Sequence, residues 1–475
     1  MKTSAKVAIG VTLALCAAIG FGAFRAYTIM HATVSPTHDY PAQIAAISRK
    51  SVQQWTPAAD YTHYASLVQS FAQGHHKLLP PRESSSYATF QMTDAVDPAA
   101  SPLDRDLALA ILRDHEQAGR FIALAELPSL VGVTRQTLLG QPVALRDYPE
   151  VGAARSVART LHARALMQFR EGETQAALAT VEQLLALSVI TGSQPTMTDY
   201  LIGGGVRALA TDAIRRACVT QSLDAQTASS LSTLLERYSV PRVKDVHLET
   251  ERLILHDAIQ WTYTDDGAGN GHFSPSGAQA LANTQPNAAA LVTNPFAAWF
   301  FADRKSVEER TNAYFAAAAE QASKPMRSRD FAQSGAIIGN LDRGHLLLGI
   351  LAPPLNKLLA ADAQTTQMDR GVRILLALEA FEAHRGRLPD SLDQLVPEFI
   401  RELPPDEWST DDKWVYRVAT SPREDGRTFL LYSIGIDQID QGGTETTPGV
   451  AALNSADSKA DFVVNMPPNA MPKFD

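Results

Sequence analysis

The chain has 475 residues, of which 45% are hydrophobic and 20% charged. This composition suits two or three folded units and excludes general disorder. The formal net charge is −9 at pH 7 and no dense basic run interrupts the acidic balance, so we expect no nucleic-acid partner. Of the two cysteines, Cys16 lies in the apolar N-terminal stretch and Cys218 in a predicted helix, which excludes a disulfide framework or a cysteine-based zinc site.

The first thirty residues have the pattern of a membrane anchor. An uncharged run, Val7–Phe24, follows Lys2 and Lys6 and is closed by Arg25. At about 1.5 Å per residue this run is just long enough to cross the hydrocarbon layer, and the two lysines favour a cytoplasmic N terminus. The sequence predicts a single-pass signal-anchor over residues 1–30 in a bacterial inner membrane, with the bulk of the chain in the periplasm. The alternative is a signal peptide that is cleaved at a small-x-small site such as Gly20-Phe21-Gly22.

The middle of the chain has helical spacing. Alanine and leucine recur with that period from about residue 42 to residue 357, with loop-like breaks at residues 80–86 and 265–287. We therefore expect an alanine-rich helical domain over residues 31–353. An envelope protein partner for this domain is compatible with the predicted location.

One helical hairpin can be placed within this domain. Two apolar helix faces flank a turn at Glu171–Glu173, which predicts antiparallel helices; the faces comprise Val157, Leu161, Ala165 and Phe169, and then Leu178, Val181 and Leu185. The hairpin loosely resembles one tetratricopeptide unit, but no repeat with the required period of about 34 residues follows. Gly203–Gly205 lacks the preceding strand of a phosphate-binding loop, so it favours close packing of helices.

The character of the sequence changes at residues 354–475. A helix with Ile374, Leu378 and Phe381 on one side reaches a stop at Gly386, and Ser391–Gln394 predicts a capping box that opens a short helix. Strands are expected at residues 414–418, 428–433 and 462–464, with a turn signal at Asp425-Gly426. The predicted fold class is mainly α with a C-terminal α+β module, in which a helix precedes a small antiparallel sheet.

Four short segments of this module resemble the globular domain of the major pseudopilin of type II secretion systems. They keep the family's order and approximate spacing, and they are Ala380–Pro389, Leu395–Pro397, Leu403–Trp408 and Leu431–Asp437. The rest of the family pattern is absent, because no acidic residue precedes Asp39 and more than 300 residues separate the anchor from the module. The chain is therefore expected to use the module without being a filament subunit.

The resemblance also implies a calcium ion. In that family the loop after the fourth segment binds Ca²⁺, and the corresponding ligands here are Asp437, Asp440 and Asp461. Hard carboxylate and carbonyl oxygens are the ligands that Ca²⁺ prefers. The alternative is a polar surface loop whose aspartates cap turns. Gln438 stands where the family has glycine, and the segment from Thr444 to Ala460 is longer than usual.

Catalytic motifs are not evident. His115-Glu116 begins like a zinc-protease helix but lacks the second histidine. His247 and Glu251 are one turn apart on a predicted helix over residues 244–263, while His256 points elsewhere; we expect a solvated, charged helix face. The leading hypothesis is a non-enzymatic binding or scaffolding protein. The runner-up is an anchored hydrolase that acts on an envelope substrate, with acidic and histidine residues from Asp245 to Asp266 in its cleft.

Overall fold

The computed structural model describes residues 19–24, 27, 34, 36–51, 61–76, 102–135, 142–145, 148–244, 246–265, 267, 270–275, 279, 301–341, 343–419, 426–443 and 461–466. Within these residues the protein is mainly helical with one small antiparallel sheet, which confirms the predicted combination of secondary structure. The predicted anchor lies outside the described residues except for its last turns.

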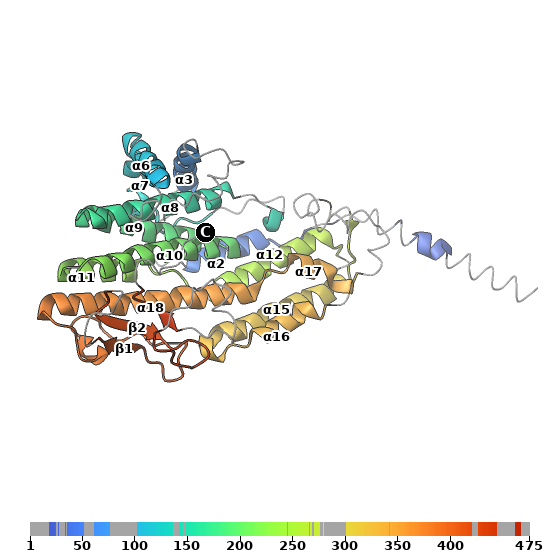
Figure 1. Ribbon diagram of the computed structural model, residues 1–475. Helices are drawn as coiled ribbons and strands as arrows, with labels where there is room; N and C mark the ends of the chain where they lie inside the picture. Colours follow the sequence, from blue (N-terminus) through green and yellow to red (C-terminus); the bar gives the residue numbers. More distant parts are fainter. Residues whose placement is uncertain are drawn as a thin grey trace, which may run out of the picture.

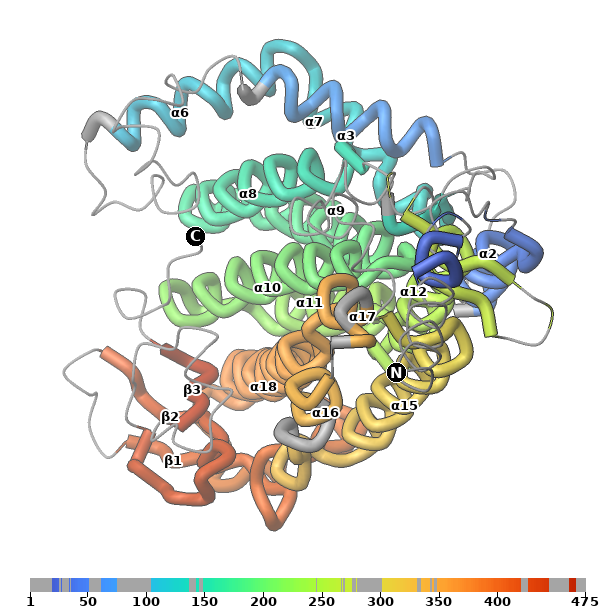
Figure 2. The backbone as a smooth tube through the Cα atoms, turned by 90° about the vertical axis from the view of Figure 1, so that its right-hand side faces the viewer, coloured from blue at the N-terminus to red at the C-terminus, as the bar shows by residue number. Residues whose placement is uncertain are grey.

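Long helices lie side by side in layers and form the body of the molecule (Figure 1). The order across the layers is α8, α9, α10 and then α18, with α11 packed against both α9 and α18. Their bounds are α8 Pro149–Arg170, α9 Thr174–Gly192, α10 Met197–Thr220, α11 Ala225–Arg237 and α18 Leu355–Arg385. A further layer over α8 is made by α3 Tyr61–His76, α6 Pro102–Gln117 and α7 Arg120–Leu124 (Figure 2).

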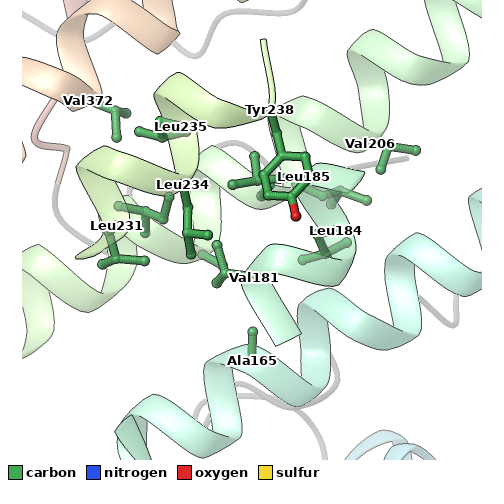
Figure 3. Packing of buried hydrophobic residues seen from close by; sticks show 14 of the residues in the cluster. Ala165, Val181, Leu184, Leu185, Val206, Leu231, Leu234, Leu235, Tyr238 and Val372 are labelled. Atoms are coloured by element: carbon green, nitrogen blue, oxygen red, sulfur yellow. The ribbon is translucent and has the colours of Figure 1, made fainter. Parts of the chain in front are cut away.

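The predicted hairpin is formed by α8 and α9, which turn at Gly172 with φ 76°. Their facing side chains join those of α10, α11 and α18 in one hydrophobic core, in which Val181, Leu185 and Leu234 lie close together (Figure 3). The role predicted for the glycine run holds at Gly203, because a Cβ there would lie 2.4 Å from Gly192 Cα of α9. Among the described residues, α9 is the one helix with the length and hydropathy of a membrane span, and most of it is buried in this core.

A second group of helices packs at one end of these layers (Figure 1). In it, α12 packs against α15 and α2, and α15 and α16 pack against α18. The bounds are α2 Tyr40–Ser51, α12 His247–Thr262, α15 Arg304–Ser323, α16 Phe331–Gly339 and α17 Leu346–Leu351. Single 3₁₀ turns lie at Leu127–Leu130 (η1), Val143–Leu145 (η2), Met326–Ser328 (η5), Arg343–His345 (η6) and Leu392–Leu395 (η7).

The sheet has the strand order β1-β2-β3 with antiparallel pairing throughout. Its strands are β1 Val415–Val418, β2 Phe429–Ser433 and β3 Phe462–Val463, close to the predicted ranges; Asp425 of the predicted turn lies outside the described residues. Gly386 ends α18 in the left-handed conformation, as predicted. The capping box at Ser391 is wrong, since its side chain accepts no cap hydrogen bond and Gln394 accepts one from Asp390 N instead.

The helix α18 begins at Leu355 and serves both halves of the molecule. Its first turns pack in the cluster with Tyr314 and Phe315, and its last turns pack under the sheet with Leu395 and Trp408. Between them, Arg207 of α10 forms a 2.6 Å ion pair with Asp369. The two predicted domains thus share one continuous core, and the boundary at residue 353 stays a prediction.

Candidate functional site

A cavity of about 600 Å³ opens where α8, α10, α12, α17 and η2 meet. Its apolar wall is formed by buried side chains of four elements, among them Val143, Val151, Ile202 and Ile254. Its polar wall is formed by the first turn of α10 together with residues of α8 and α12. Small-molecule sites are concave and combine apolar walls with a few placed polar groups. This cavity has an apolar wall and a polar one, so it is the candidate binding site.

The start of α10, at the wall of the cavity, is fixed by a buried ionic cluster. Arg135 donates two hydrogen bonds to the carboxylate of Asp199, at 2.8 and 2.9 Å, and a third to Glu150 at 3.2 Å. Asp199 also closes a capping box with Thr196, accepting from its hydroxyl at 2.7 Å. Every oxygen of Asp199 is therefore occupied within the protein, and this carboxylate serves to position the wall.

Glu251 of α12 lines the cavity next to that cluster and is only partly buried. Its Oε1 accepts a hydrogen bond from the backbone N–H of Met197. Burial in the cavity wall, aided by the nearby Asp199 charge and opposed by the hydrogen bond from Met197 N, raises the pKa of this carboxyl to about 7. A carboxyl with this pKa exchanges its proton near neutral pH.

Arg155 supplies the cationic side of the cavity. It is exposed on α8, one turn beyond Val151, and lines the same cavity. No ion pair joins its guanidinium to another described residue. Gly152 lies at the same edge, where a Cβ would meet no atom within 4 Å. This edge is therefore open and positively charged.

Of the histidines and acids that the sequence singled out on α12 and just after it, Glu251 lines the cavity, whereas His247, His256 and Asp265 do not. His247 is fully buried, donates to Gln194 O at 3.0 Å, and has its pKa lowered to about 4 by burial. His256 lies 2.9 Å from Asn312 Oδ1, and Asp265 pairs with Arg304 at 3.3 Å. The predicted divergence of His256 from His247 is confirmed. Asp245 and Asp266 lie outside the described residues.

The prediction of a solvated, charged face on α12 is correct only in part. Glu249 and Arg252 form the expected exposed pair at 2.5 Å. Glu251 is wrongly assigned to that face, because it turns to the cavity and to the α10 N terminus. Likewise His115, in the motif rejected as a zinc-protease helix, is a buried ring stacked on Phe71 with centroids 4.0 Å apart.

The three predicted calcium ligands lie in one loop region and bond to protein donors. Asp437 accepts from Ile439 N at 3.1 Å, and Asp461 accepts from Gly443 N at 2.7 Å. Asp440 accepts from Tyr432 Oη at 2.9 Å and forms an ion pair with Arg417. Within the described part of the chain, no three acidic, histidine or cysteine residues converge as metal ligands. Calcium binding therefore stays a prediction.

Three residues that build or line the site escaped the sequence analysis, namely Asp199, Arg135 and Arg155. The pattern of Thr196 followed three residues later by Asp199 is a capping-box signal that would have located the start of α10. Arg135 carried no usable signal, because its partners are 15 and 64 residues away in the chain.

Comparison with known proteins gives no relative for this chain: no protein-family model, no curated protein and no solved structure matches it significantly.

Proposed function

We propose that this chain is a membrane-anchored, extracytoplasmic binding protein whose ligand site is the cavity between α8, α10, α12 and α17. The observation that carries the binding role is the cavity itself. Its volume of about 600 Å³ falls within the range of about 300–1,000 Å³ that small-molecule sites occupy. Its apolar wall would supply affinity, and Glu251 and Arg155 at the polar side would orient the ligand.

A neutral apolar fluorophore, N-phenyl-1-naphthylamine, tests this proposal on the full chain. Its fluorescence should rise on binding to the wild-type protein. Gly152→Trp places a large ring at the open edge of the cavity, so this variant should lose the signal. Gly205→Trp is the matched control, since Gly205 is also an exposed helical glycine with no atom within 4 Å of its Cβ position but lies outside the cavity. Equal signals from the three proteins, or none from the wild type, would contradict the proposal.

The membrane part of the proposal rests on Val7–Phe24. At its described end, Ile19, Phe21 and Phe24 expose 64%, 65% and 67% of their surface. Large apolar side chains exposed together are suited to contact with lipid. Protease added to the periplasmic face of spheroplasts should digest the bulk and leave a membrane-bound N-terminal fragment. A soluble protein that begins near Ala23 would show cleavage instead.

The C-terminal module is proposed to share the pseudopilin-like architecture that its sequence resembles. The observed order of helix followed by an antiparallel sheet supports this, and so does Gln438, whose φ of 60° is a conformation that glycine adopts without strain. Gln438 is held there by hydrogen bonds from its amide to Trp408 O and Gly435 O. Calcium at Asp437, Asp440 and Asp461 belongs to the same proposal.

One observation favours the runner-up, an anchored hydrolase. Glu251 lies in a cavity with a pKa of about 7, which suits proton transfer at neutral pH. Incubation of the protein with isolated cell envelopes, followed by mass spectrometry of released fragments, separates the two functions. Fragments released by the wild-type chain and not by Glu251→Gln would favour the hydrolase over the binding protein.

A further inference from the structure

Only one of the two carboxyl oxygens of Glu251 accepts a hydrogen bond from a described residue. Its Oε1 accepts from Met197 N, whereas Oε2 has no hydrogen-bond partner among the described residues. A partly buried carboxylate oxygen without a partner loses hydration and gains nothing in return. The free oxygen of Glu251 therefore offers a ligand a strong acceptor at the cavity wall.

Carboxylates outnumber cations on this side of the cavity. Among the residues that the structure describes, Arg135 is the one cation paired with Asp199 and Glu150, and it bonds to both. Glu251 has no cationic partner among the described residues. A ligand that brings a positive charge would satisfy Glu251 with a charge-assisted hydrogen bond, which is stronger than a neutral one. An ammonium group is the donor that this position favours.

Arg155 sets a second condition on the ligand. Its guanidinium lies at the exposed edge of the same cavity without an ion-pair partner among the described residues. A ligand with a positive charge alone would be repelled there, whereas a carboxylate would be attracted and could accept two hydrogen bonds. The two unpaired charges of opposite sign therefore favour a zwitterion, and the buried apolar wall between α8, α10 and α12 favours an apolar body.

We propose that the cavity binds a short apolar peptide by its free ends, with the peptide ammonium group on Glu251 Oε2 and its carboxylate on Arg155. This inference rests on the proposed binding function and names the ligand class for the same site.

Three matched ligands test it on the full chain by isothermal titration calorimetry: trileucine, N-acetyl-trileucine and trileucine amide. Acetylation removes the ammonium charge, and amidation removes the carboxylate charge. The wild-type protein should bind trileucine at least about tenfold more tightly than N-acetyl-trileucine, as expected for a hydrogen bond to a charged group. In Glu251→Gln, which keeps an acceptor for Met197 N, this preference should vanish. In Arg155→Gln, the preference for trileucine over its amide should vanish.

The neutral fluorophore separates the possible failures. If it binds the wild-type cavity while trileucine does not, or while N-acetyl-trileucine binds as tightly as trileucine, the peptide inference is wrong and the binding function stands. If Glu251→Gln still binds the fluorophore but keeps the preference for the free ammonium group, another residue holds that group and the inference is also wrong. If the fluorophore does not bind the wild-type protein, the proposed function itself fails.

Discussion

Replacement of Gly203 by alanine should destabilise the protein sharply, because α9 and α10 touch backbone to backbone at this point. The new Cβ would lie 2.4 Å from Gly192 Cα, 2.5 Å from Gly192 N and 2.9 Å from Ser188 O. Non-bonded carbons prefer separations of about 3.5–4.0 Å. All three obstacles are backbone atoms, so no side chain can rotate away and the two helices must separate.

The size of the effect follows from two opposing contributions. Overpacking of a core costs about 1–3 kcal/mol, and the upper end is expected here because backbone must move. Replacing glycine with alanine inside a helix returns about 1 kcal/mol. The net loss in the free energy of unfolding should be about 2 kcal/mol.

Gly205→Ala is the matched control on the same helix, since its Cβ would meet no atom within 4 Å. This variant gains the higher helix propensity of alanine without the clash, so the free energies of unfolding of the two variants should differ by about 3 kcal/mol. Urea unfolding followed by circular dichroism measures both. If Gly203→Ala resists urea as well as Gly205→Ala, the close approach of α9 and α10 is not real and the wall of the cavity is misplaced with it.

Three further changes test the site and the C-terminal loop. Asp199→Asn breaks a buried ion pair and should lower the free energy of unfolding, measured in urea, by about 3–5 kcal/mol. Glu320→Gln, which breaks an exposed pair, should lower it by less than about 1 kcal/mol. Similar losses in the two variants would refute the burial of Asp199. Burial raises the pKa of Glu251 from 4.5 to about 7, with Asp199 and Arg155 as the other charged residues at the cavity. The folded state therefore holds this proton more tightly, and the wild-type chain should lose stability relative to Glu251→Gln as pH rises from 4.5 to 7; a constant difference over this range would contradict the shift. Calcium at a hundred times its dissociation constant should stabilise the wild-type protein by about 2.7 kcal/mol and leave Asp437→Ala unchanged; equal melting temperatures of the wild type in calcium and in chelator would count against the metal.

The features that sequence reasoning located correctly are those encoded by neighbouring residues. The α8–α9 hairpin follows from two apolar stripes and a glycine turn, and the end of α18 follows from one glycine in the left-handed conformation. The three strands were recognisable because each is short and contains β-branched or aromatic residues, and because the turn signal Asp425-Gly426 separates the first two. Local spacing carries this information directly.

The candidate site could not be located in the same way, since it depends on contacts between distant segments. Glu251 has a charged neighbour, Arg252, so its own helix looks like a solvated face. Its carboxyl lies at the cavity because it accepts a hydrogen bond from the N–H of Met197, 54 residues earlier in the chain. The cavity is completed by α17, about 100 residues later. Periodicity describes a helix alone and does not report what packs against it.

The continuous helix α18 has a consequence for how the molecule opens. Its 31 residues span about 46 Å without a break, and its middle is clamped by Arg207 at Asp369. The sheet end cannot loosen by rotating about a linker, so its backbone amides must open together with those of the helical layers. Hydrogen exchange in the middle of α18 should therefore be as slow as in α9, and a chain cut at the predicted boundary would lose the layer that holds both halves in one cooperative unit.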